Sequence, residues 1–196
     1  SRRRIHAQTR LLIQNRLVTR GNTEEMVKYG HTEAEAKKAL NTYKTSMKSS
    51  FMTSANTAGN IFKSEDADKV IDALLHSLSK LKYEVKTDEK DEKEGTATVI
   101  LKSQSVNVSE IQSKLMANVR KAAASGKITD QSQIGTYVLT EMAKLIKETK
   151  PTKEMKETTL KMKLKKVKIN KKEVERWMPE NNYTFEMQIG RLLISQ

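Results

Sequence analysis

Apolar positions recur at a helical period in several stretches of the chain. The widest apolar stripe lies in residues 65–81, where apolar side chains return every three or four positions. Narrower stripes predict helices near the N-terminus, over about 32–52, over 109–125, over 130–150 and over 185–193. The members of the widest stripe are Val70, Ile71, Leu74, Leu75, Leu78 and Leu81.

Several helix starts carry a capping signature, in which a polar side chain is followed three residues later by Glu or Gln. Thr32 with Glu35 is the clearest pair. Ser109 with Gln112 and Asn22 with Glu25 follow the same spacing. Glycines and prolines predict the helix ends, with Gly126 ending one helix and Pro151 following the next.

Strands are predicted where apolar and polar residues alternate. Alternation before and after Gly95 predicts a hairpin over 83–106, with the charged run DEKDEKEG at its tip. A second hairpin is predicted from 158–169 and 173–178, the latter carrying Trp177. Because the alternation changes phase after Leu164, we expect a β-bulge near Lys165 and Lys166 that bends the sheet.

These elements predict an α+β fold: helices packed on a curved, mainly antiparallel four-stranded sheet. We expect the 65–81 stripe to pack on the inner side of this sheet. Residues 1–19 are interpreted as a basic N-terminal helix, with the alternatives that part of it is non-native or that it is a transit peptide. Residues 20–196 are interpreted as one α+β domain.

Charge adds a candidate surface. The net charge is +13, and residues 144–176 hold thirteen Lys or Arg against five Glu, a balance that favours polyanions or anionic surfaces as neighbours. Lys161, Lys163 and Lys165 alternate with Leu160, Met162 and Leu164, so they share the outer face of the predicted strand. They are the candidate anion-contacting residues, and the alternative is an ordinary solvated lysine surface.

Motifs for catalysis or cofactor binding are absent from the sequence. The chain has no cysteine, and His6, His31 and His76 lie in different segments without metal-ligand spacing. The acidic run at 88–94 lacks the spacing of a calcium loop, which favours a solvated hairpin tip. We therefore assign no catalytic residue, no cofactor and no metal ligand, and expect no enzymatic activity.

No segment of the sequence reaches the roughly 20 consecutive apolar residues that a helix needs to cross a bilayer.

The order of segments resembles a known family. GNTEEMVKYGHTEAEAKKAL, KYEV, GTATVILKSQSVNVSEI and TTLKMKLKKVKINKKEVERW are similar to an uncharacterised lipoprotein family of Gram-positive bacteria, over about residues 20–193. The resemblance implies a cystatin-like or NTF2-like domain at the cell envelope, with a signal peptide and a lipid-bearing cysteine preceding it. It implies no catalytic residue.

The expected function is thus that of a non-enzymatic, extracellular lipoprotein domain, anchored to the cell membrane, that binds a small molecule or an envelope component. Its partner would be an anionic envelope surface or a small apolar ligand. Two alternatives stay open: a cytoplasmic polyanion binder that takes nucleic acid on its lysine-rich sheet face, and an NTF2-like enzyme. Nucleic acid is the less favoured partner, because exposed aromatic side chains do not alternate with the lysines.

Overall fold

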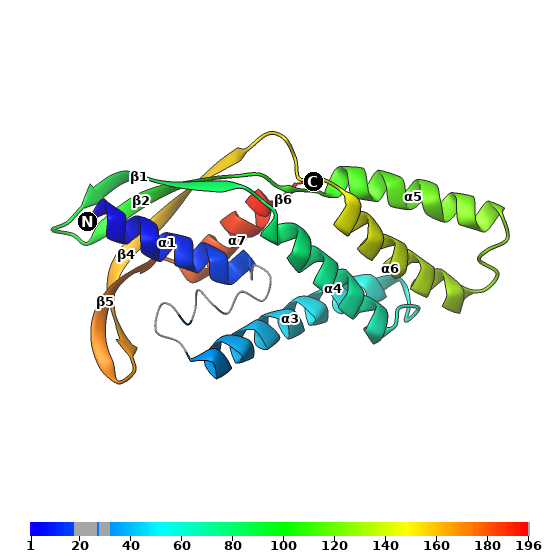
Figure 1. Ribbon diagram of the computed structural model, residues 1–196, viewed down its shortest axis with the longest axis horizontal. Coiled ribbons are helices and arrows are strands. Elements are labelled where there is room, and N and C mark those ends of the chain that lie inside the picture. Colours follow the sequence, from blue (N-terminus) through cyan, green and yellow to red (C-terminus); the bar gives the residue numbers. More distant parts are fainter. Residues whose placement is uncertain (18–26, 28–31, 196) are drawn as a thin grey trace. The chain divides into compact units, whose positions relative to one another are not determined.

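The computed structural model describes residues 1–17, 27 and 32–195, and within them the chain forms two compact units (Figure 1). The sheet unit combines residues 1–17, 81–106 and 152–195. The described residues of the helical unit are 27, 32–80 and 107–151. Because two compact units can belong to one folding domain, the expected division into residues 1–19 and 20–196 stays a prediction.

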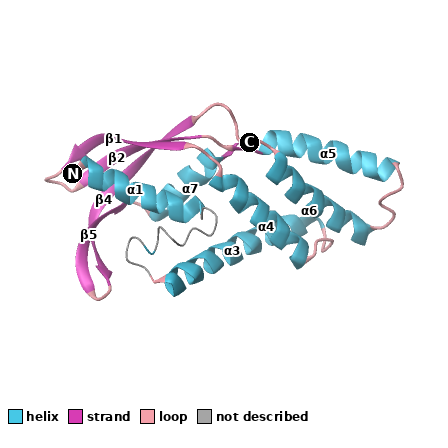
Figure 2. Cartoon of the chain, viewed as in Figure 1, coloured by secondary structure: helices cyan, strands magenta, loops and turns pink. Residues whose placement is uncertain are grey.

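The sheet unit is built on four antiparallel strands (Figure 2). They are β1 (Tyr83–Asp91), β2 (Thr96–Ser103), β4 (Lys156–Ile169) and β5 (Lys172–Pro179), paired in the order β1-β2-β4-β5. Two short strands, β3 (Val106–Asn107) and β6 (Ile194–Ser195), form a second, two-stranded sheet. The predicted α+β class and four-stranded antiparallel sheet are confirmed.

Two helices pack on the four-stranded sheet. Helix α1 (Arg2–Leu17) contacts the two edge strands, β1 and β5, and helix α7 (Asn182–Leu193) contacts β4. The buried face of the sheet follows the predicted alternation. Fully or almost fully buried side chains of this unit include Ile5, Ala97, Val99, Leu101, Leu160, Met162, Trp177, Phe185, Ile189, Leu192 and Leu193.

The helical unit contains α3 (Glu33–Ala55), a 3₁₀ turn η2 (Asn56–Ala58), α4 (Ser64–Ser79), α5 (Val108–Ala124) and α6 (Gln131–Glu148). The stripe of α4 packs mainly on α6 and also on α3, which is a different partner from the sheet face that we expected. Helix α6 offers a matching apolar side through Leu139, Ala143 and Ile146, all buried. Leu81 lies beyond the end of α4 and belongs to the sheet unit.

The predicted helix caps have different outcomes. Thr32 accepts a hydrogen bond from the Glu35 amide at 3.1 Å, and the Glu35 side chain accepts one from the Thr32 amide, so this capping box is confirmed. The box at Ser109 is wrong: α5 begins two residues earlier than expected, and Asn107 caps it by accepting from the Glu110 amide. The pair Asn22 and Glu25 lies outside the described residues.

The predicted bulge near Lys165 and Lys166 is also wrong. The pairing of β4 with β5 runs without a register shift from Met162 opposite Pro179 to Ile169 opposite Lys172. The break in register lies instead in β1, between Thr87 and Glu89. Beyond Lys163, β4 pairs only with β5, so the ends of these two strands form a two-stranded ribbon.

No helix within the described ranges combines the length and the apolar character that crossing a bilayer requires.

Candidate functional site

The three candidate lysines lie on one face of β4. Leu160 and Met162, which alternate with them, are buried, whereas Lys161 and Lys163 are exposed. Lys165 is half-buried, and its ammonium group donates a hydrogen bond to the Pro179 carbonyl at 3.0 Å. The predicted sidedness of the strand is therefore confirmed, while contact with an anion stays a prediction.

The β5 strand adds a fourth cation that sequence reasoning missed. Arg176 pairs directly with Lys165, and Met178 pairs with Lys163, so both lie on the same face as the lysines. We call Lys161, Lys163, Lys165 and Arg176 the basic row. The alternation of residues in β5 could have predicted which face Arg176 lies on. It could not predict that Arg176 pairs with Lys165, because that depends on the register between the two strands.

The acidic residues of β5 face the opposite side of the ribbon. Glu175 pairs with Lys166, and Glu173 with Lys168, on the other face from Arg176. Lys166 forms an ion pair with Glu173 at 3.7 Å on that face. Within the described part of the chain, no ion pair links a cation of the basic row to a carboxylate. The row thus keeps its positive charge available for a partner.

One end of the row borders a hollow of mixed charge, with a volume of about 570 Å³. Lys161 lines it together with Arg2 and Lys90. The carboxyl-bearing residues Asp88, Glu89, Asp91 and Glu180 line it as well. These acids lower the positive potential near Lys161 relative to Lys163 and Arg176. The strongest anion attraction is therefore expected toward the ribbon end of the row.

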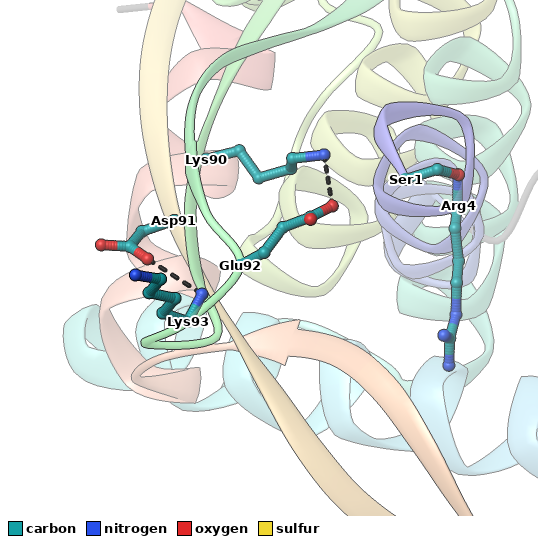
Figure 3. Close-up of polar contacts among 6 residues, drawn as sticks. All are labelled: Ser1, Arg4, Lys90, Asp91, Glu92 and Lys93. Atoms are coloured by element: carbon teal, nitrogen blue, oxygen red, sulfur yellow. Dashed lines mark hydrogen bonds and ion pairs between the residues drawn. The ribbon is translucent and has the colours of Figure 1, made fainter.

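The acidic run forms the predicted hairpin tip (Figure 3). Asp91 accepts hydrogen bonds from the amides of Lys93 and Glu94, at 3.0 and 3.1 Å, and Gly95 adopts a positive φ of 64°. Lys90 pairs with Glu92 at 2.6 Å, and this hydrogen bond and charge lower the pKa of the Glu92 carboxyl. Within the described ranges, no three His, Asp or Glu side chains gather into a group suited to a metal ion.

The described histidines have separate structural settings. His6 Nε2 accepts a hydrogen bond from the Thr87 amide at 2.7 Å, beside the bulge in β1. His76 is exposed near the end of α4. His31 lies outside the described residues. The role of His6 was missed because it depends on a contact between residues 81 positions apart.

These features define the class of the protein: an α+β protein with helices packed on a four-stranded antiparallel sheet. The family DUF5105, a domain of unknown function, matches residues 21–194, and the chain belongs to this family. No curated protein sequence matches the chain.

A solved structure shares the fold. It is that of ycdA, a candidate lipoprotein of Bacillus subtilis, which is 17% identical with a TM-score of 0.61. The match covers 85% of this chain and 48% of that one, so this chain spans about half the length of ycdA. The expected likeness to an uncharacterised, lipoprotein-like family is supported at this level, and the NTF2-like or cystatin-like assignment stays a prediction.

Proposed function

We propose that the chain is a non-enzymatic domain of a cell-envelope lipoprotein, which contacts a phosphate-bearing envelope component through the basic row. The observation that carries the proposal is the sidedness of strands β4 and β5: the row lies on one face, and Glu173 and Glu175 lie on the other. A lipid-bearing segment preceding the domain would hold it at the outer side of the membrane, as the resemblance implies. The likeness of the fold to the candidate lipoprotein ycdA supports the envelope location.

The spacing of the row suits a repeating anion. Alternate residues on one strand face stand roughly 6.6 Å apart, so Lys161, Lys163 and Lys165 present charges at a regular interval. Arg176, on the neighbouring strand, widens the row to two strands. Phosphates of a wall polymer and of an anionic lipid surface share the chemistry that such a row recognises.

The displaced pKa values of the carboxyl groups have local structural causes. Among the residues that the structure describes, Glu92 and Asp130 have pKa values displaced below the ordinary range. The hydrogen bond and charge of Lys90 lower the pKa of Glu92, and hydrogen bonds from the Ser132 hydroxyl and the Gln133 amide lower that of Asp130. Neither has the raised pKa of a buried general acid. The alternative of an NTF2-like enzyme stays a prediction.

The nucleic-acid alternative has less support. The row is interleaved on its own face with Val167, Val174 and Met178, not with aromatic side chains on which bases could stack. A phosphate partner needs no such stacking. A small apolar ligand stays a further prediction.

The test compares the full chain with a triple variant, Lys161→Glu, Lys163→Glu and Arg176→Glu. Sedimentation with phosphatidylcholine vesicles, with and without phosphatidylglycerol, measures lipid binding, and titration with inorganic polyphosphate measures polymer binding. We expect salt-sensitive binding to one of these probes and a loss of about a hundredfold in the variant, from on the order of 1 kcal/mol per cation.

The matched control is Lys38→Glu, Lys121→Glu and Lys144→Glu, which changes the net charge equally at exposed positions of the helical unit. It should retain most of the binding. Binding to vesicles alone identifies a lipid surface, and binding to polyphosphate alone identifies a polymer. No binding to either probe, an equal loss in the control, or tighter binding to single-stranded DNA than to polyphosphate would overturn the proposal.

A further inference from the structure

A second surface feature lies in the helical unit, along one side of α6. Ser132, Thr136 and Thr140 follow one another at intervals of four residues, so their hydroxyl groups form a ladder along the helix. Gln133 and Tyr137 stand beside this ladder, and together these side chains line a hollow of about 500 Å³. This volume lies within the range of small-molecule sites.

Two lysines complete the lining of the hollow. Lys63 comes from the segment just before α4, and Lys127 comes from the loop between α5 and α6. Both are exposed, and neither forms an ion pair with a carboxylate among the residues that the structure describes. The hollow therefore combines hydroxyl groups and the Ile128 side chain with two ammonium groups that form no ion pair. The hydroxyl groups of Ser132 and Thr136 donate to the carboxylates of Asp130 and Asp66, so some negative charge lies beside the lining.

A glycine in α6 brings Lys63 to this position. A β-carbon at Gly135 would lie 2.0 Å from the carbonyl oxygen of Ile61, so only glycine admits the backbone of that segment against the helix. Gly135 is buried under this contact. Glycine inside a helix costs about 1 kcal/mol of stability relative to alanine. At Gly135 it allows the segment that leads into Lys63 to pack directly against α6.

The polar groups of the floor have fixed orientations. Asp66, which is only 5% exposed, accepts a hydrogen bond from the Thr136 hydroxyl at 2.8 Å. The Thr136 oxygen is therefore oriented as an acceptor toward any further partner. The Gln133 side-chain oxygen accepts from both the amide and the hydroxyl of Thr129, so its NH₂ group is the part that is left to donate.

We propose that this hollow binds a small polyol that carries one anionic group, such as a sugar phosphate. Alternating donors and acceptors on α6 suit the hydroxyl groups of a sugar, and the Tyr137 ring offers an apolar surface for a sugar face. Two ammonium groups match the charge of a single phosphate, which is about −2 near neutral pH. Two cations neutralise too little charge for a long polyanion, which separates this site from the basic row.

The site is tested by titrating the full ¹⁵N-labelled chain with glucose 6-phosphate, with glucose and with inorganic phosphate. Glucose 6-phosphate should give saturable shifts at the amides around Thr136, Tyr137 and Lys127, and should bind at least about tenfold more tightly than either simpler probe, or roughly 1.4 kcal/mol. The double variant Lys63→Ala and Lys127→Ala should weaken this binding about tenfold or more.

The control for that variant is Lys38→Ala with Lys80→Ala, which removes two exposed lysines elsewhere in the same unit. It should bind as the unchanged chain does. The proposal is overturned by an absence of saturable shifts, by equal binding of inorganic phosphate or of glucose, or by an equal loss in the control. None of these results depends on the basic row, so this proposal and the proposed function can be refuted independently of each other.

Discussion

The Nε2 atom of His6 accepts a hydrogen bond from the amide of Thr87, 2.7 Å away, where β1 shifts its register against β2. Thr87 is only 5% exposed, so its amide has little access to water. A buried amide without a partner costs roughly 1–3 kcal/mol, which makes this bond a local requirement of the fold. A helix side chain thus supplies an acceptor beside the bulge.

His6→Ala is expected to destabilise the sheet unit by about 1–3 kcal/mol, because the Thr87 amide loses its acceptor. Urea unfolding followed by the fluorescence of Trp177, the single and buried tryptophan, measures this unit directly. His76→Ala is the matched control: His76 is exposed, and its loss should change the stability by less than about 0.5 kcal/mol. Equal effects of the two changes would contradict the assigned role of His6.

Helix α1 also covers the opposite edge of the sheet. Gln8 accepts a hydrogen bond from the Trp177 amide, and the Arg4 guanidinium donates to the Glu175 carbonyl, both on the edge strand β5. Removal of residues 1–17 would expose backbone groups of both edge strands. Since free edges pair with other chains, we expect concentration-dependent association, measured by light scattering during size-exclusion chromatography. A truncated chain that stays monomeric at high concentration would refute this protective role.

The local elements could be predicted from sequence because their signals are local. Thr32 caps α3 and Asp130 caps α6 through groups three residues away, and Gly126 lies just beyond the end of α5. Such interactions involve few neighbours, so tertiary packing seldom overrides them. The hairpin tip before Gly95 follows from the same kind of local chemistry.

The choice of partner could not be predicted in the same way. The apolar stripe of α4 suits another helix as well as a sheet, and only the assembled fold selects α6. The change of phase at Val167 reflects the β4–β5 ribbon, where β4 has one partner strand and Val167 is half-buried beside Val174. Neither face of the ribbon is fully buried, so apolar and polar residues need not alternate strictly along it. The change of phase therefore occurs without a bulge.

The same distinction between local and long-range signals applies to the candidate sites. The row of Lys161, Lys163 and Lys165 could be found from alternation within one strand. Arg176 joins it through the register between two strands, and the hollow on α6 receives Lys63 from a separate segment. Both additions depend on contacts between residues distant in sequence, for which a single sequence carries no direct signal.

Thr32→Ala should reduce the stability of the helical unit by about 1 kcal/mol, because the Glu35 amide loses its capping oxygen. The loss of helical circular dichroism at 222 nm during urea denaturation measures the change. Thr45→Ala, at an exposed position inside α3, is the control. It should be neutral or slightly stabilising, since alanine has the higher helix propensity. A cap variant as stable as this control would show that the capping box contributes nothing.

The pKa of Asp130 lies below its ordinary value, first because the Ser132 hydroxyl donates to the carboxylate and then because the Gln133 amide does. A lowered folded-state pKa means that the stabilisation is present above the unfolded-state pKa and is lost as the pH falls through the folded one. Carbon-detected NMR titration should find the Asp130 pKa below that of an ordinary aspartate and find it higher in Ser132→Ala. An unchanged pKa in that variant would contradict the assigned cause.

Gly135 and Gly190 provide a direct comparison of two helical glycines. Both lie inside helices, but an added β-carbon at Gly190 meets nothing within 4 Å, whereas at Gly135 it would lie 2.0 Å from the Ile61 carbonyl oxygen. Gly190→Ala should therefore stabilise the chain by up to about 1 kcal/mol through helix propensity. Gly135→Ala should destabilise it by about 1–3 kcal/mol, because the segment that leads to Lys63 must move away from α6.

Urea unfolding of the two glycine variants, followed by circular dichroism for the loss of helix and by tryptophan fluorescence for the sheet unit, measures both changes. If Gly135→Ala also shifts the Lys63 amide resonance while that of Lys38 stays in place, the displacement is local to the segment that leaves α6. Opposite signs for the two substitutions are the expected result, because helix propensity acts equally at both positions and only one has a backbone oxygen in the way. Stabilisation by Gly135→Ala would mean that Ile61 does not approach α6 closely, and Lys63 would then lose its structural reason for lining the hollow.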